Sequence, residues 1–156
     1  MRELFRVKMP LTDDLKVCAD DTIGIDLSNC VRIEGYAVTW DVDNINRIFT
    51  HDAIKCKKNT PIFLQHDIDM NIGVLTDYVV DHIGLFVTGY IDKASPGIER
   101  ILDLFNNGYC LNLSVAGFID GYYIDEGTMV ITDYNLIEVS LVTNPINKYA
   151  IITNLT

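Results

Sequence analysis

Alternating apolar and polar positions recur along the chain and predict a mainly β protein. Seven segments are rich in the β-branched and aromatic residues that favour strands. Short turns that contain glycine are predicted at 82–84, 120–121 and 126–127. The predicted strands are 31–40, 61–66, 72–80, 85–91, 111–119, 129–134 and 136–143.

One segment has the apolar spacing of an amphipathic helix. Ser95 and Pro96 are typical of an N-cap and a first helical position, and the helix is expected to end before Gly108. A second short helix is predicted at 48–54. The side chains that would share the apolar face of the first helix are Ile98, Ile101, Leu102 and Phe105.

These elements predict an α+β, mainly β fold, in which about seven strands form a barrel or strongly curved sheet with one or two packed helices. A length of 156 residues fits a single domain over 1–156. Residues 10–29 carry five Asp among few large apolar groups. We therefore expect 1–30 to form an N-terminal strand and a loosely held loop.

Composition and charge narrow the classes of function. Hydrophobic residues make up 49% and charged residues 22%, which is typical of a folded globular protein. Twelve Lys and Arg against 22 Asp and Glu give a net charge of −10, which opposes nucleic-acid binding. Neither a membrane span nor the apolar core of a signal peptide is found. A soluble protein made in a cytoplasm, with no nucleic-acid or membrane partner, is expected.

Cysteine and histidine spacing does not indicate a metal site. The four cysteines form no C-x-x-C pair, and the three histidines lack the i, i+4 spacing of a zinc-binding helix. We expect reduced, mostly buried thiols, no metal and no cofactor.

Three polar residues lie within apolar predicted strands: His66, Ser114 and Glu138. Each type alone is more often structural than catalytic. Together they supply what hydrolysis by a serine nucleophile requires, because a hydroxyl becomes nucleophilic when an imidazole takes its proton and an acid orients that imidazole.

Strand alternation ranks the candidate acids and nucleophiles. Asp67 follows His66 directly and would face away from it if the strand continues, so Glu138 is the better orienting acid. Ser140 shares the face of Glu138 and is either a second hydrogen-bonding group or polar filling. Cys110 is a weaker alternative nucleophile, since no basic neighbour would lower its pKa.

Six short segments follow one another in a recognisable order over 31–150. They are EGYA at 34–37, PIFLQHD at 61–67, IGV at 72–74, GLFVTG at 84–89, LSV at 113–115 and EVSLVTNP at 138–145. This order resembles the prohead (capsid maturation) protease family of tailed bacteriophages.

The resemblance implies a fold related to the herpesvirus maturation proteases, the assemblins, with a β-barrel, surrounding helices and a triad in the chain order His, Ser, third member. His66 matches the family histidine in Q-H-D and Ser114 the serine in L-S. Glu138 stands where the herpesvirus enzymes have a second histidine.

The oxyanion donors are expected among backbone N–H groups near the Ser114–Gly117 turn, where Val115 and Ala116 lie, or in the loop after Val142. Many family members have one residue fewer before the glycine. The extra residue here predicts a bulge or a shifted oxyanion loop before Gly117.

The implied function is a serine endopeptidase of phage capsid maturation. It would act in the host cytoplasm, inside the assembling prohead, on scaffold and/or the scaffolding segment of the major capsid protein, and on itself. A homodimer or higher homo-oligomer is expected, with the helix at 95–107 as one candidate interface. Two alternatives stay open: a catalytically silent protease-fold subunit with a structural or scaffold-binding role, and a β-barrel binding module unrelated to phage.

Overall fold

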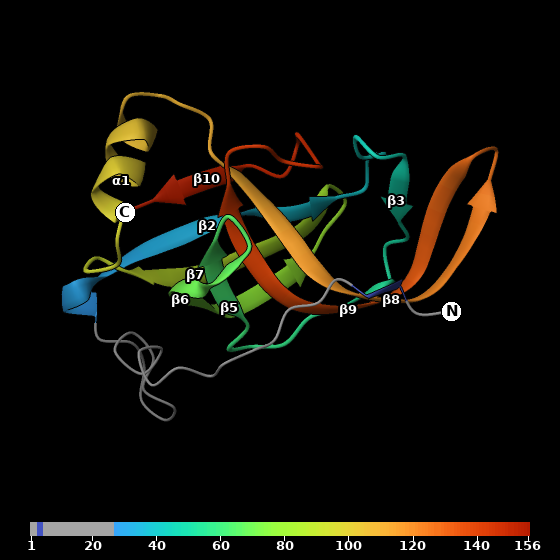
Figure 1. Ribbon diagram of the computed structural model, residues 1–156, viewed down its shortest axis with the longest axis horizontal. Helices are drawn as coiled ribbons and strands as arrows, with labels where there is room; N and C mark the ends of the chain where they lie inside the picture. The colour runs from blue at the N-terminus through green and yellow to red at the C-terminus, as the bar shows by residue number, and fades with distance from the viewer. Residues whose placement is uncertain (1–2, 5–26) are drawn as a thin grey trace.

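The computed structural model describes residues 3–4 and 27–156 (Figure 1). Most of the predicted N-terminal loop lies outside the described residues. The described part begins with β1 and a 3-10 helix at Leu27–Asn29 and contains one α-helix, α1 (Ile98–Asn106). Its strands are β1 (Glu3–Leu4), β2 (Cys30–Thr39), β3 (Arg47–Phe49), β4 (Ile54–Lys55), β5 (Pro61–Leu64), β6 (Asp67–Val80), β7 (Gly84–Asp92), β8 (Asn112–Asp125), β9 (Thr128–Val142) and β10 (Ile152–Leu155).

All of these strands belong to one mixed sheet in the order β1-β8-β9-β5-β6-β7-β2-β10, and β3 and β4 pair with β9. The short stretch at 150–152 hydrogen-bonds to the chain at both ends of the strand order. Ile151 O accepts the Tyr36 N–H of β2 at 3.0 Å, and the Ile152 N–H donates to Leu111 O, just before β8, at 2.9 Å. The sheet therefore curves until its ends approach each other, which confirms the predicted mainly β, strongly curved architecture.

Buried apolar side chains of the sheet form one core, and α1 packs against it. Phe63, Leu85 and Ile91 are among the fully buried side chains. Ile98 of α1 is buried, and the other three residues predicted for its apolar face are partly buried against the same core. The apolar face of α1 is thus used within the chain, and its role in an oligomer stays a prediction.

The long strands follow the predicted segments, with one merger. The segments at 129–134 and 136–143 form the single strand β9, because Asn135 between them stays extended and pairs with Phe118 of β8 and Lys55 of β4. The predicted turn at 120–121 is wrong: Gly121 lies in β8, where the register shifts.

Both helix predictions need correction. The segment at 48–54 is not a helix, because β3 and β4 each pair in parallel with β9 and a turn joins them. The main helix begins at Ile98, and its N-cap is Gly97 with φ 84° and no side-chain cap. The Ser95 carbonyl accepts the Ile98 N–H at 3.3 Å, so Ser95 closes a turn and does not cap the helix.

The cysteines differ from one another. Cys56 and Cys110 are free thiols, and burial raises the pKa of Cys56 to about 11. Cys30, at the start of β2, is buried.

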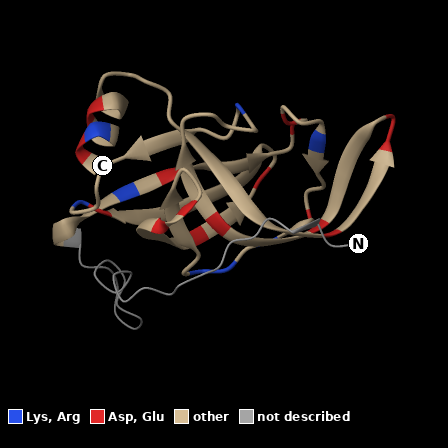
Figure 2. Cartoon of the chain, viewed as in Figure 1, with Lys and Arg blue, Asp and Glu red and all other residues tan. Residues whose placement is uncertain are grey.

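Charged residues are spread over several elements of the described chain, with acidic positions on strands, on turns and on α1 (Figure 2). None of the helices in residues 3–4 and 27–156 is long and apolar enough to cross a membrane.

Gly117 in β8 is packed so closely that a side chain would collide with the neighbouring strand. A Cβ atom there would lie 2.1 Å from the Asn135 carbonyl oxygen of β9. At Gly121, in the same strand, the closest atom would be the side-chain oxygen of Thr132 at 3.0 Å, which can rotate away. We expect Gly117→Ala to reduce the free energy of unfolding by about 1–3 kcal/mol and Gly121→Ala to reduce it much less. Urea unfolding checks this, and equal losses in the two variants would contradict the packing described.

Candidate active site

His66 lies in a two-residue turn between β5 and β6. Leu64 pairs with Asp67 on either side of this turn. Gln65 has φ 54° and His66 has φ 58°, and positive φ at both central positions is the requirement of a type I′ hairpin turn. The predicted strand therefore ends at Leu64, and the assumption that it continues through His66 is wrong. The imidazole projects from a turn whose backbone conformation is uncommon for residues other than glycine.

Glu138 of β9 is a carboxylate with 0% of its surface exposed. Burial of a charged group is costly unless it is paired and hydrogen-bonded. One carboxylate oxygen, Oε1, is hydrogen-bonded to Nδ1 of His66. The other, Oε2, accepts the Ser140 hydroxyl at 2.6 Å.

This pairing defines the state of the imidazole. An ionised carboxylate only accepts hydrogen bonds, so Nδ1 of a neutral His66 carries the proton and Nε2 has a lone pair. The His66 side chain is 36% exposed, whereas Glu138 is fully covered. The buried acid thus holds one side of a ring whose other nitrogen is able to accept a proton.

Ser114 is placed by the register of β8 on β9. Ser114 lies opposite Ser140, and Ala116 lies opposite Glu138. Directly opposite residues of an antiparallel pair project on the same face, with Cβ atoms about 4.5–5.5 Å apart. Ser114, Glu138 and Ser140 therefore share one face of the sheet. Ser114 is 8% exposed.

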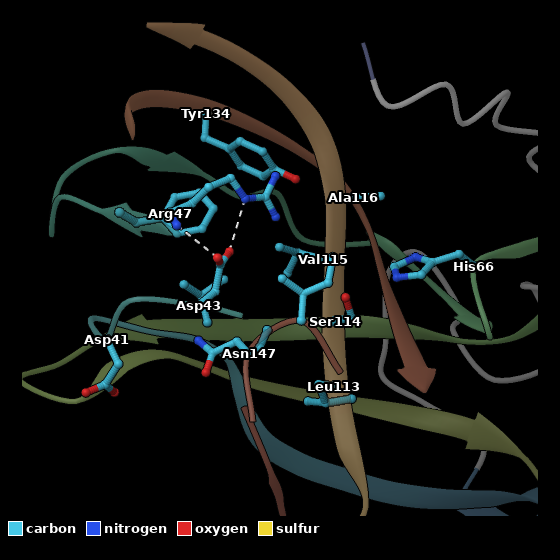
Figure 3. Close-up of a pocket in the computed structure, with 14 residues that line it drawn as sticks. Asp41, Asp43, Arg47, His66, Leu113, Ser114, Val115, Ala116, Tyr134 and Asn147 are labelled. Atoms are coloured by element: carbon cyan, nitrogen blue, oxygen red, sulfur yellow. Dashed lines mark hydrogen bonds and ion pairs between the residues drawn. The ribbon is translucent and has the colours of Figure 1, made fainter. Parts of the chain in front are cut away.

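Ser114 and His66 line the same pocket, which has a volume of about 300 Å³. Figure 3 shows Ser114 between the imidazole and an ion pair, in which Arg47 Nε donates to Asp43 Oδ2 at 3.0 Å. Tyr134 also lines the pocket, and burial raises its pKa, so its hydroxyl stays protonated. The serine therefore opens onto a cavity that is large enough for a side chain of a substrate.

Beside Ser114, backbone N–H groups of β8 point away from β9. The Leu113 N–H donates away from β9, to Ala150 O at 2.9 Å, and Leu141 O accepts the Gln65 N–H at 2.8 Å on the far side of β9. Leu113 and Leu141 are thus a pair without mutual hydrogen bonds. Because N–H directions alternate along a strand, the Val115 N–H also points away from β9.

The residues predicted to surround the oxyanion lie in a strand and differ in their surroundings. Residues 114–117 lie in strand β8, so the predicted turn there is wrong. Val115 and Ala116 line the pocket, whereas Gly117 faces the Asn135 carbonyl. The register shifts between Ala116 and Gly117, and the extra residue, Ile137, is on β9. The register shift beside Gly117 thus comes from an extra residue in β9, and not from the extra residue that the sequence predicted in the Ser114–Gly117 segment.

The competing candidates lie elsewhere. The Asp67 carboxylate accepts the Asp69 N–H at 3.0 Å and lies at an exposed position. Cys110 is exposed and precedes β8. Within residues 3–4 and 27–156, the His, Cys, Asp and Glu side chains form no group of three or more that could hold a metal ion.

Several site residues were not identified from the sequence. Asp43 lies in a loop, Arg47 begins β3 and Tyr134 lies in the distant part of β9, and no local pattern links them to Ser114. Gln65 and Thr143 lie within the segments PIFLQHD and EVSLVTNP, so their presence in these motifs was the available signal.

A solved structure of low sequence identity shares the fold. The bacteriophage T4 capsid assembly protease, gp21, has a TM-score of 0.55 and 13% identity, over 72% of this chain and 81% of that chain. The KSHV protease in complex with a hexapeptide phosphonate inhibitor has a TM-score of 0.45 and 13% identity, over 79% of this chain and 64% of that chain. No match to this sequence was found among curated proteins.

The family comparison covers most of the chain. Residues 14–156 match the family described as caudovirus prohead serine protease. This range includes the six segments at 34–145 and every residue of the pocket, so it confirms the resemblance seen in the sequence. The chain belongs to the caudovirus prohead serine protease family.

Proposed function

We propose that this protein is a serine endopeptidase with Ser114 as nucleophile, His66 as general base and Glu138 as the acid that orients His66. The observation that carries the proposal is the hydrogen bond between His66 Nδ1 and the buried Glu138 carboxylate. Glu138 shares a face of the sheet with Ser114, and His66 lines the same pocket as Ser114. Membership of a serine protease family supports it independently.

The reaction would be acyl transfer in two steps. Ser114 Oγ attacks the scissile carbonyl while His66 Nε2 takes the hydroxyl proton, and the imidazolium then returns that proton to the leaving amine. Water attacks the acyl-enzyme ester with the same base and releases Ser114. Glu138 keeps the proton on Nδ1 and stabilises the imidazolium through its negative charge.

The Val115 N–H is the proposed oxyanion donor. It follows the nucleophile directly, and the alternation of β8 directs it to the edge away from β9. A backbone donor fixed within a strand needs no reorganisation when negative charge develops on the carbonyl oxygen.

The proposed substrates are components of the prohead. The family is described by its role in the prohead, and the T4 structure is that of a capsid assembly protease. We propose cleavage of scaffold and/or the scaffolding segment of the major capsid protein, and self-cleavage, inside the assembling capsid in the host cytoplasm. Co-expression with a capsid precursor and its scaffold tests this through the masses of the products.

The nucleophile is tested by covalent labelling with a fluorophosphonate. We expect the wild type to be labelled on Ser114 and Ser114→Ala to remain unlabelled and to leave capsid precursor uncut, with an unchanged melting temperature. Ser95→Ala, which changes a serine outside the pocket, serves as the matched control. A folded wild type that is not labelled would favour the catalytically silent subunit, and labelling of Ser114→Ala would assign another nucleophile.

The orienting acid is tested by removing its charge. Glu138→Gln keeps the shape of the side chain, and loss of this role in a serine protease lowers the rate by up to about 10⁴. We expect the rate of labelling or of peptide cleavage to fall at least about tenfold, because the variant removes the charge that orients the imidazole. Asp67→Asn should be much less affected, because the Asp67 carboxylate bonds to the Asp69 amide. A normal rate in Glu138→Gln together with a large loss in Asp67→Asn would reverse the assignment.

The base is tested by pH. A protonated imidazole cannot accept the Ser114 proton, so kcat/KM should fall as the pH is lowered from about 8 to about 5. The rate of a chemically limited step is measured across this range. A flat profile would remove His66 from the mechanism.

A further inference from the structure

The turn that carries His66 is held by a second set of contacts, outside the proposed triad. The Ser140 hydroxyl accepts the His66 backbone N–H at 3.1 Å while it donates to Glu138. Ser140 is fully buried. One hydroxyl group therefore fixes the backbone of the histidine and the carboxylate that its imidazole contacts.

Gln65, the other residue of the turn, is held at both ends of its amide. Its Nε2 donates to the Thr143 hydroxyl at 2.9 Å, and its Oε1 accepts the Thr143 N–H at 3.2 Å. Its backbone N–H donates to Leu141 O at 2.8 Å. The stretch of β9 from Ser140 to Thr143 thus contacts both residues of the turn.

Comparison with a second two-residue turn of the chain shows the backbone strain that these contacts offset. Glu126 and Gly127 join β8 to β9 through a two-residue turn with φ 47° and 85°. Glycine occupies its second position, where positive φ costs little. The turn at Gln65 and His66 has no glycine, although both of its residues have positive φ. Its conformation is strained locally and depends on surrounding contacts.

We propose that Gln65 and Ser140 are positioning residues, which hold the turn in its left-handed conformation so that His66 reaches Glu138 and Ser114 together. This inference rests on the proposed role of His66 as the base. Neither residue is needed to contact substrate, so the effect should fall on the chemical step and leave binding unchanged.

Gln65→Gly separates positioning from simple turn formation. Glycine adopts positive φ without strain, so the turn should form at least as well, but the contacts with Thr143 are lost. With a fluorophosphonate probe we expect the limiting rate of labelling to fall about 10- to 100-fold, because small misplacements of a reacting group have effects of this size. The half-saturating probe concentration should not rise, and the melting temperature should not fall.

Glu126→Gly is the matched control, since it introduces glycine at the same position of the other two-residue turn, and it should keep the wild-type labelling rate. Thr143→Ala removes the hydroxyl contact but keeps the backbone N–H contact with Gln65, so it should lower the rate less than Gln65→Gly. The double variant should be no slower than Gln65→Gly alone, and Thr143→Ser should retain most of the rate. Ser140→Ala, measured as a folded protein, should also lower the limiting rate.

The outcomes distinguish the two proposals. A labelled wild type and a Gln65→Gly variant with the same limiting rate would overturn the positioning role while the triad stands. A folded wild type that does not react would overturn the triad, and the positioning role with it. A slow Gln65→Gly with a normal Glu126→Gly supports both.

Discussion

The buried carboxylate of Glu138 is the constraint on which the site depends. With no exposed surface, it must find its hydrogen-bonding partners within the protein. The Ser140 hydroxyl on its own strand and the His66 imidazole across from it meet that need. For the imidazole to arrive there, the chain between β5 and β6 must reverse within two residues, which requires positive φ at both. The hydrogen bond between His66 and Glu138 therefore offsets two costs: the local strain of the turn and the burial of the charged carboxylate.

The same strand pair positions the nucleophile. β9 contributes Glu138 and Ser140, and the register of β8 sets Ser114 opposite Ser140. The bulge at Ile137 shifts the following register, and Gly117 allows β8 to lie close to Asn135 beyond it. Ser114 sits on a rigid strand and His66 on a turn clamped to that sheet, so both groups are held by backbone hydrogen bonds as well as by packing.

The sequence predicts the long strands well because their apolar alternation reflects burial, and it singles out three polar residues because they interrupt apolar strands. It predicts a helix at 48–54 wrongly, since short edge segments take their structure from β9 and not from local propensity. The left-handed turn at His66 carries no glycine signal. The ion pair of Asp43 and Arg47 reaches the pocket through tertiary folding alone.

The hydrogen bond between His66 and Glu138 is the central claim, and proton NMR observes it most directly. In protein labelled with ¹⁵N-histidine, the Nδ1 proton of His66 should resonate at low field and disappear in Glu138→Gln, while Asp67→Asn keeps it. The His66→Gln variant assigns the signal. A low-field His66 resonance that survives in Glu138→Gln, or one that is lost in Asp67→Asn, would contradict this account.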